Sequence, residues 1–131
     1  MALDSALGQF PYPYLQSTSY DADGRVTQRT LGGTADRVQT TYEYYWWASQ
    51  GGRLYRIKSG TPFVDPPATP DPTKFQDLYY NYDLVGNILH IYDYKAGPQM
   101  QTFSYDPLYR LLSANAVGGS GGLYSEGYTY L

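Results

Sequence analysis

The sequence predicts an all-β fold, an antiparallel array of β-hairpins, on three observations. First, a degenerate pattern recurs along most of the 131 residues: aromatic, any residue, Tyr-Asp, two residues, Gly, a basic or polar residue and an aliphatic one. Second, its tyrosines are evenly spaced, with 24 residues from Tyr20 to Tyr44, 23 from Tyr82 to Tyr105 and 25 from there to Tyr130. Third, 17 of the residues are Tyr, whose apolar ring and polar hydroxyl suit a half-wet sheet. A short period with a turn signal in each copy is typical of stacked hairpins.

The clearest copy of the pattern lies in residues 80–92. Tyr80 and Tyr82 are two apart, so both rings point to one face of an extended strand. Asp83 breaks the alternation, and at the first position of a turn its carboxylate can accept backbone N–H groups. Gly86 can take positive φ without a Cβ clash. From Asn87 the chain is again rich in β-branched and aromatic residues, so one copy is a β-hairpin.

The first part of the chain divides at about residue 17. Residues 1–16 contain Pro11 and Pro13, which favour an extended segment over a helix. Residues 17–131 form the predicted hairpin array. Its first copy has a strand ending at Tyr20, a turn over residues 21–24 and a return strand from Arg25.

The second copy has a strongly aromatic incoming strand, predicted over residues 40–47, and a turn lengthened to residues 48–52. Alternating aromatic residues on strands usually make core and cross-strand contacts. The alternative is an exposed platform for glycans or peptides. High exposure of either tryptophan would favour the platform, and burial of both would favour the structural repeat. The candidate platform residues are Tyr42, Tyr44, Trp46 and Trp47.

A proline-rich insertion at about residues 61–73 explains the one long interval in the spacing, between Tyr44 and Tyr82. Five prolines lie between Thr61 and Pro72. Proline fixes φ and cannot donate to a strand ladder, so a central strand is excluded. A surface insertion is favoured over a recognition motif, because proline-rich ligands usually show more regular spacing.

In the fourth copy a tyrosine stands where glycine is expected. Asp106 opens the turn, Pro107 has the preset φ of the second position, and Tyr109 takes the glycine place before Arg110. A non-glycine residue at positive φ costs on the order of 1 kcal/mol, so either the turn type changes or packing offsets the strain. Residues 128–130 resemble the opening of a fifth copy.

Composition argues against several classes of protein. The 9 basic and 12 acidic residues give a net charge of −3, and the basic residues are scattered, so nucleic acid is not an expected partner. The chain has no Cys and no apolar stretch near the roughly 20 residues of a transmembrane helix. The first residues lack the basic start and apolar run of a signal peptide.

No arrangement of residues indicates an enzyme, a metal site or a cofactor. His90 is the single histidine and lies in a predicted strand, where packing is a more common role than catalysis. The run from Asp21 through Asp23 to Gly24 is similar to part of a calcium loop but lacks the distal Glu, and a hairpin turn explains it better.

Residues 20–26, 82–88 and 105–111 resemble the YD repeat of the Rhs family, Tyr-Asp-x-x-Gly-Arg-Leu. This family includes Rhs polymorphic toxins, the C components of toxin complexes, wall-associated proteins and teneurin ectodomains. The resemblance implies a curved sheet that is a fragment of a hollow YD-repeat shell. The residues that match the repeat turn are Tyr20, Asp21, Gly24, Arg25, Tyr82, Asp83, Gly86, Asn87, Tyr105, Asp106 and Arg110.

The function implied by this resemblance is structural and non-catalytic: a shell segment for encapsulation or cell-surface contact in a secreted or cell-surface protein. The implied partners are further YD repeats, or copies of the chain joined through open sheet edges. The alternative is an extracellular module that binds carbohydrate or protein with exposed Tyr and Trp and self-assembles. A shell that encloses a folded toxin needs many more repeats than this chain carries.

Overall fold

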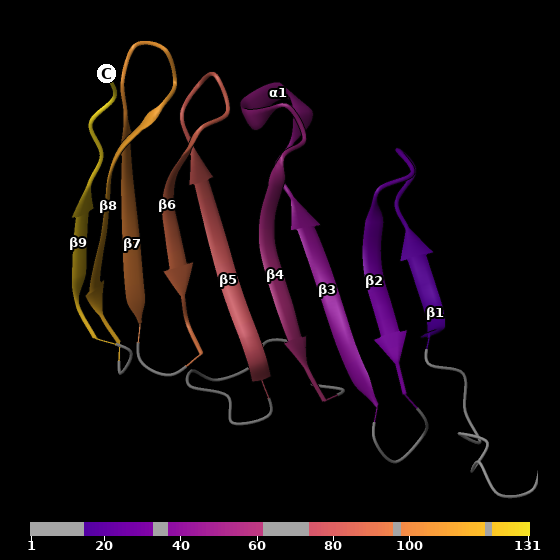
Figure 1. Cartoon of the computed structure of the whole chain (residues 1–131). Coiled ribbons are helices and arrows are strands. Elements are labelled where there is room, and N and C mark those ends of the chain that lie inside the picture. Colours follow the sequence, from indigo (N-terminus) through magenta and orange to yellow (C-terminus); the bar gives the residue numbers. More distant parts are fainter. Residues whose placement is uncertain (1–14, 33–36, 62–73, 96–97, 120–121) are drawn as a thin grey trace, which may run out of the picture.

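The computed structural model describes residues 15–32, 37–61, 74–95, 98–119 and 122–131, which form one antiparallel sheet. Nine strands lie side by side in chain order, which confirms the predicted hairpin array (Figure 1). The strands are β1 (Leu15–Tyr20), β2 (Val26–Leu31), β3 (Val38–Tyr44), β4 (Leu54–Gly60), β5 (Lys74–Tyr82), β6 (Ile88–Asp93), β7 (Gln99–Tyr105), β8 (Leu111–Gly118) and β9 (Tyr124–Gly127). Of the expected N-terminal segment and proline-rich insertion, residues 1–14 and 62–73 lie outside the described residues.

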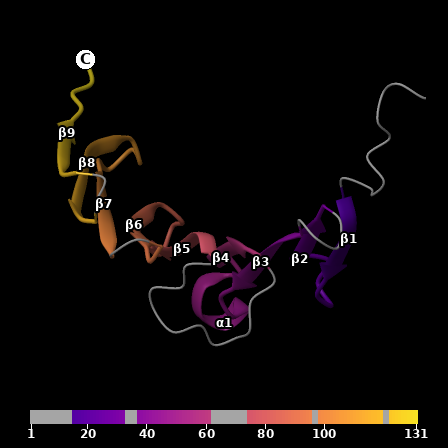
Figure 2. The same ribbon diagram turned by 90° about the horizontal axis from the view of Figure 1, so that it is seen from below.

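The sheet is a single curved layer. Seen along its strands, it forms an arc with β1 and β9 at the two ends and the middle strands at its base (Figure 2). Among the described residues, the buried apolar side chains are Ala114 and Ala116. The sheet is therefore held together by strand pairing and by contacts along its surfaces, and not by a closed apolar core.

Every YD hairpin carries a bulge at the same place in its return strand. In the first hairpin Ser19 faces Gln28 while Tyr20 faces Val26, so one residue of β2 has no opposite partner. The same shift occurs between β3 and β4, β5 and β6, and β7 and β8. A bulge bends its strand and increases the local twist, so the array bends in each hairpin. The extra residues are Thr27, Tyr55, Leu89 and Leu112.

The second copy departs from the prediction between its two strands. The aromatic strand ends at Tyr44, not at residue 47, and the expected loop contains a short helix, α1 (Trp47–Gln50). The turn aspartate of the other copies is replaced here by Tyr45, so the longer connection satisfies its N–H groups with its own carbonyls. Gln50 donates to the Trp46 carbonyl at 3.1 Å, for example. In the described part of the chain, no helix is long and apolar enough to cross a membrane.

Candidate functional site

The repeat turn is closed by its aspartate. Oδ1 of Asp21 accepts the N–H groups of Asp23 at 3.0 Å and Arg25 at 2.9 Å. The corresponding bonds, to the residues two and four positions ahead, form at Asp83 and Asp106. A carboxylate at this position satisfies donors that the turn would otherwise leave unpaired. The turn therefore requires a short side chain with an accepting oxygen at its first position.

The second carboxylate oxygen of the turn aspartate, Oδ2, accepts a hydrogen bond from the side chain of the residue that follows the glycine position. Arg25 donates Nε to Asp21 at 2.8 Å, Asn87 donates Nδ2 to Asp83 at 2.8 Å, and Arg110 donates Nε to Asp106 at 2.6 Å. Burial alone would raise the pKa of Asp21, but the N–H group and guanidinium of Arg25 together hold it below its usual value. The pKa of Asp106 is also lowered, chiefly by the hydrogen bond from the Arg110 N–H. These carboxylates are ionised acceptors at neutral pH.

Where the side chain after the turn is an arginine, it also contacts the tyrosine of the next copy. The guanidinium carbon of Arg25 lies 4.5 Å from the ring centroid of Tyr44, a cation–π distance. Arg110 lies 4.5 Å from the Tyr130 ring in the same way. The tyrosine hydroxyls then donate back to the preceding hairpin, from Tyr44 to the Val26 carbonyl at 2.7 Å, Tyr105 to Ile88 at 2.9 Å and Tyr130 to Leu111 at 2.8 Å. We call this pairing of the post-turn side chain with the next repeat tyrosine the inter-repeat clamp.

The second copy keeps the clamp with different residues. Tyr45 takes the aspartate place, since its N–H donates to the Arg53 carbonyl at 2.9 Å as Asp21 does to Arg25. Arg53 reaches the next turn, 3.2 Å from the Asp83 carbonyl and 5.8 Å from the Tyr82 ring. Sequence reasoning missed Tyr45 and Arg53 as turn residues. The even tyrosine spacing was the available signal, because it places Tyr44 as the repeat tyrosine and the next residue as its aspartate.

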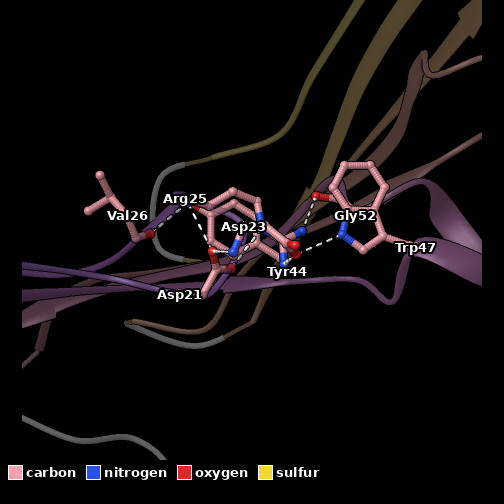
Figure 3. Close-up of polar contacts among 7 residues, drawn as sticks. All are labelled: Asp21, Asp23, Arg25, Val26, Tyr44, Trp47 and Gly52. Atoms are coloured by element: carbon pink, nitrogen blue, oxygen red, sulfur yellow. Dashed lines mark hydrogen bonds and ion pairs between the residues drawn. The ribbon is translucent and has the colours of Figure 1, made fainter.

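Beside the first clamp, Trp47 is fixed over the turn (Figure 3). Its Nε1 donates to Asp23 Oδ2 at 2.8 Å, and its ring centroid lies 5.2 Å from the Arg25 guanidinium carbon. Arg25 also donates Nη1 to the Gly52 carbonyl at 3.0 Å. A Cβ on Gly52 would lie 2.8 Å from two atoms of the Trp47 ring, so only glycine allows this packing.

An open hollow of about 360 Å³ adjoins this cluster. Both tryptophans that line the hollow are strongly exposed: Trp46 is 84% and Trp47 is 59% accessible. Both tryptophans lie in the connection between β3 and β4, not on the strand. Tyr44 lines the hollow with them, whereas Tyr42 is half-buried further down β3 and does not. The lining residues are Asp23, Arg25, Tyr44, Tyr45, Trp46 and Trp47.

Other candidate chemistry has a structural explanation. The ring of His90 lies 5.8 Å from that of Tyr92, in a half-buried position on β6. Within the described ranges, no group of three or more His, Cys, Asp and Glu residues lies close enough to hold a metal ion. The carboxylates of Asp21 and Asp23 are engaged by Arg25 and Trp47.

The chain is similar to a curated toxin subunit and to a solved toxin structure. A toxin subunit, YenC1 of Yersinia entomophaga, is 34% identical over 111 residues, which are 77% of this chain and 10% of that protein. The crystal structure of TcdB2-TccC3-TEV matches with a TM-score of 0.58 and 31% identity, over 77% of this chain and 4% of the solved one. No family model matches. The chain thus spans about a tenth of its curated relative.

Proposed function

The chain belongs to the YD-repeat, or Rhs-repeat, family of toxin-complex proteins, and from this we propose that it is a structural wall segment of a hollow shell. One observation carries the proposal: each hairpin repeats the same bulge, so the sheet bends in one continuing arc. Continued over more repeats, such a bend produces a closed wall. The role of a wall segment is encapsulation or cell-surface contact and involves no catalysis.

A wall of this kind needs further strands at both edges. Nine strands form an open arc, and their single layer leaves both faces without a second layer of described residues (Figure 2). Open sheet edges invite pairing with another strand. The partners that fit are further YD repeats, either in a longer chain or in other copies. A shell protein of this type acts outside the cell, so a secreted or cell-surface location belongs to the same proposal.

The test is the intact mass of the protein from its native source, detected with an antibody against this segment. A species far heavier than 14.8 kDa, absent from cells in which the segment is deleted, supports the wall role. A species at 14.8 kDa contradicts a role within a large single-chain shell.

The exposure of the two tryptophans favours a second candidate, a surface that binds carbohydrate or protein. α1 projects on the convex side of the arc (Figure 2), which would be the outside of a closed wall. Exposed indole rings offer flat apolar faces of the kind that sugar rings stack on. The wild-type chain is screened against a broad glycan panel, and we expect Trp46→Ala to abolish binding to every glycan that the wild type binds. Leu84→Ala is the matched control, because Leu84 is 92% exposed at the next turn. Failure of the wild-type chain to bind any glycan or cell-surface protein rejects this candidate.

A further inference from the structure

The strands of neighbouring hairpins meet in one fixed register. In each case the residue three before the repeat tyrosine faces the residue three after the post-turn side chain. The four pairs are Thr41 with Gln28, Tyr79 with Arg56, Thr102 with His90, and Gly127 with Ser113. The register and the contacts of the repeat tyrosine together define a socket on each return strand for the incoming strand of the next copy.

The last socket holds a weakly attached strand. β9 is the shortest of the described strands, with four residues that are all exposed. Its repeat tyrosine, Tyr130, sits on Arg110 and Leu111 but remains 43% exposed. Among the described sockets, the β8 socket is therefore the one from which the bound strand detaches at the lowest cost in free energy.

The first repeat tyrosine has no socket in the described part of the chain. Tyr20 occupies the same position in its copy as Tyr130 does in the fifth, yet it is 62% exposed. β1, which carries it, has six residues and pairs with β2 on one side only. β1 and β9 run in the same direction, because eight antiparallel steps separate them. β1 of a second copy can thus lie on β8 in the orientation that β9 has now.

We propose that copies of this chain associate head to tail by strand exchange, with β1 of one copy replacing β9 on β8 of another. The conserved register places Ser17 opposite Ser113, and Tyr20 on Arg110 with its hydroxyl directed to the Leu111 carbonyl. The exchange adds the polar groups of the outer β1 edge to a ladder, which offsets the loss of the shorter β9. Such an interface joins two different surfaces, so it produces an open chain or a ring.

Association depends strongly on protein concentration. β9 competes from within its own chain, where its effective concentration is in the millimolar range. Exchange therefore appears only in concentrated protein unless β9 is weakened. The proposal uses the same repeat geometry as the wall role, but it concerns the 131-residue chain on its own.

Cysteine pairs test the register directly, because the chain has no Cys. Directly opposed residues on antiparallel strands have Cα atoms about 4.5–5.5 Å apart, within disulfide reach. We expect an equimolar mixture of Ser17→Cys and Ser113→Cys proteins to form a mixed disulfide dimer on mild oxidation. Six strands separate these two positions within one described sheet, so a bond between them reports contact between copies. Cross-linking only of Ser17→Cys with itself would mean edge-to-edge pairing of two β1 strands and would overturn the proposal.

Two tyrosine variants give opposite results if exchange occurs. Tyr130→Ala weakens the resident β9 and should tighten association about tenfold, whereas Tyr20→Ala should weaken it by a similar factor. Sedimentation velocity over a concentration series measures both, and circular dichroism checks that each variant keeps its sheet. Equal effects of the two variants, or a wild-type chain that stays monomeric at all concentrations, would reject strand exchange. Either result would leave the mass test of the wall role untouched.

Discussion

Tyr109 has the left-handed conformation that glycine has in two other YD turns, with φ of 63° against 78° at Gly24 and 109° at Gly86. The turn itself is unchanged, since the Tyr109 N–H donates to the Asp106 carbonyl at 2.9 Å. The side chain is 60% exposed, so little packing compensates for the strain. We predict that Tyr109→Gly raises the free energy of unfolding by about 1 kcal/mol in urea titrations.

The matched control for this substitution is Gly24→Ala. A Cβ at Gly24 would meet no atom within 4 Å, so its cost is that of the positive φ alone. We expect a loss of about 1 kcal/mol, equal and opposite to the gain at Tyr109. Destabilisation by Tyr109→Gly would mean that contacts of the tyrosine ring outweigh the backbone strain.

The turn carboxylates make stability depend on pH. The pKa values of Asp21, Asp83 and Asp106 lie below the ordinary value in the folded protein. A lowered pKa contributes stability above the unfolded value of about 3.9, and that contribution is lost as the pH falls through the folded value. We predict a melting temperature that is level near pH 6 and falls below about pH 4. Asp83→Asn, measured over the same range, should flatten part of this decline, and an unchanged profile would exclude the turn as its source.

At the scale of the hairpin, Arg25 joins two copies. It is paired with Asp21, donates to the Gly52 carbonyl, and lies over the rings of Tyr44 and Trp47. We predict that Arg25→Ala lowers the free energy of unfolding by about 2 kcal/mol, because charge-assisted bonds and cation–π contacts are lost together. Arg29→Ala is the control on the same strand, since Arg29 is exposed and should change stability by less than about 0.5 kcal/mol. Equal losses at the two sites would show that the clamp adds no stability.

The middle of the sheet relies on a buried ion pair between β4 and β5. Asp77 is fully buried and accepts two bonds from Arg56, at 2.8 and 2.9 Å. Removing one charge leaves the other without its partner, so Asp77→Asn should cost about 3 kcal/mol, the low end of the usual range because Arg56 is a quarter exposed. Asp93→Asn on β6 makes the same chemical change at a half-buried side chain, whose Oδ1 accepts a solvent-exposed hydrogen bond from the Lys95 N–H at 2.9 Å. Chemical denaturation of both variants compares them, and a loss at residue 77 no larger than at residue 93 would contradict the assignment.

At the scale of the whole molecule, the strand order followed from the sequence because each period carries its own turn signal. The curvature was expected from the family resemblance and not from the residues themselves, since the bulged positions Thr27, Tyr55, Leu89 and Leu112 share no residue type and a bulge is visible only in the register. The exposed tryptophans were predicted as strand residues, because an aromatic run favours a strand locally. Because the turn aspartate is missing, the connection contains α1, and both tryptophans lie there instead of on the strand. The turn residues of the three YD copies were readable from the sequence, but Tyr45 and Arg53 of the second copy were not. The clamp joins positions 19 to 29 residues apart and needed the folded register.

In the described residues, each strand pairs only with its neighbours in the sequence, so a local defect should stay local. We predict that the backbone amides of β1 and β9 exchange fastest and those of the strands around the Arg56–Asp77 pair slowest. Hydrogen exchange measured by mass spectrometry tests this. Arg25→Ala should increase exchange in β1–β4 and leave β7 and β8 unchanged. Arg110→Ala should do the reverse, since it removes the corresponding clamp at the other end of the arc. If either variant raised exchange equally in all strands, the sheet would open as one cooperative unit, and repeats could not be added or removed without changing the stability of the whole array. The local outcome is the one that a wall built from interchangeable hairpins requires.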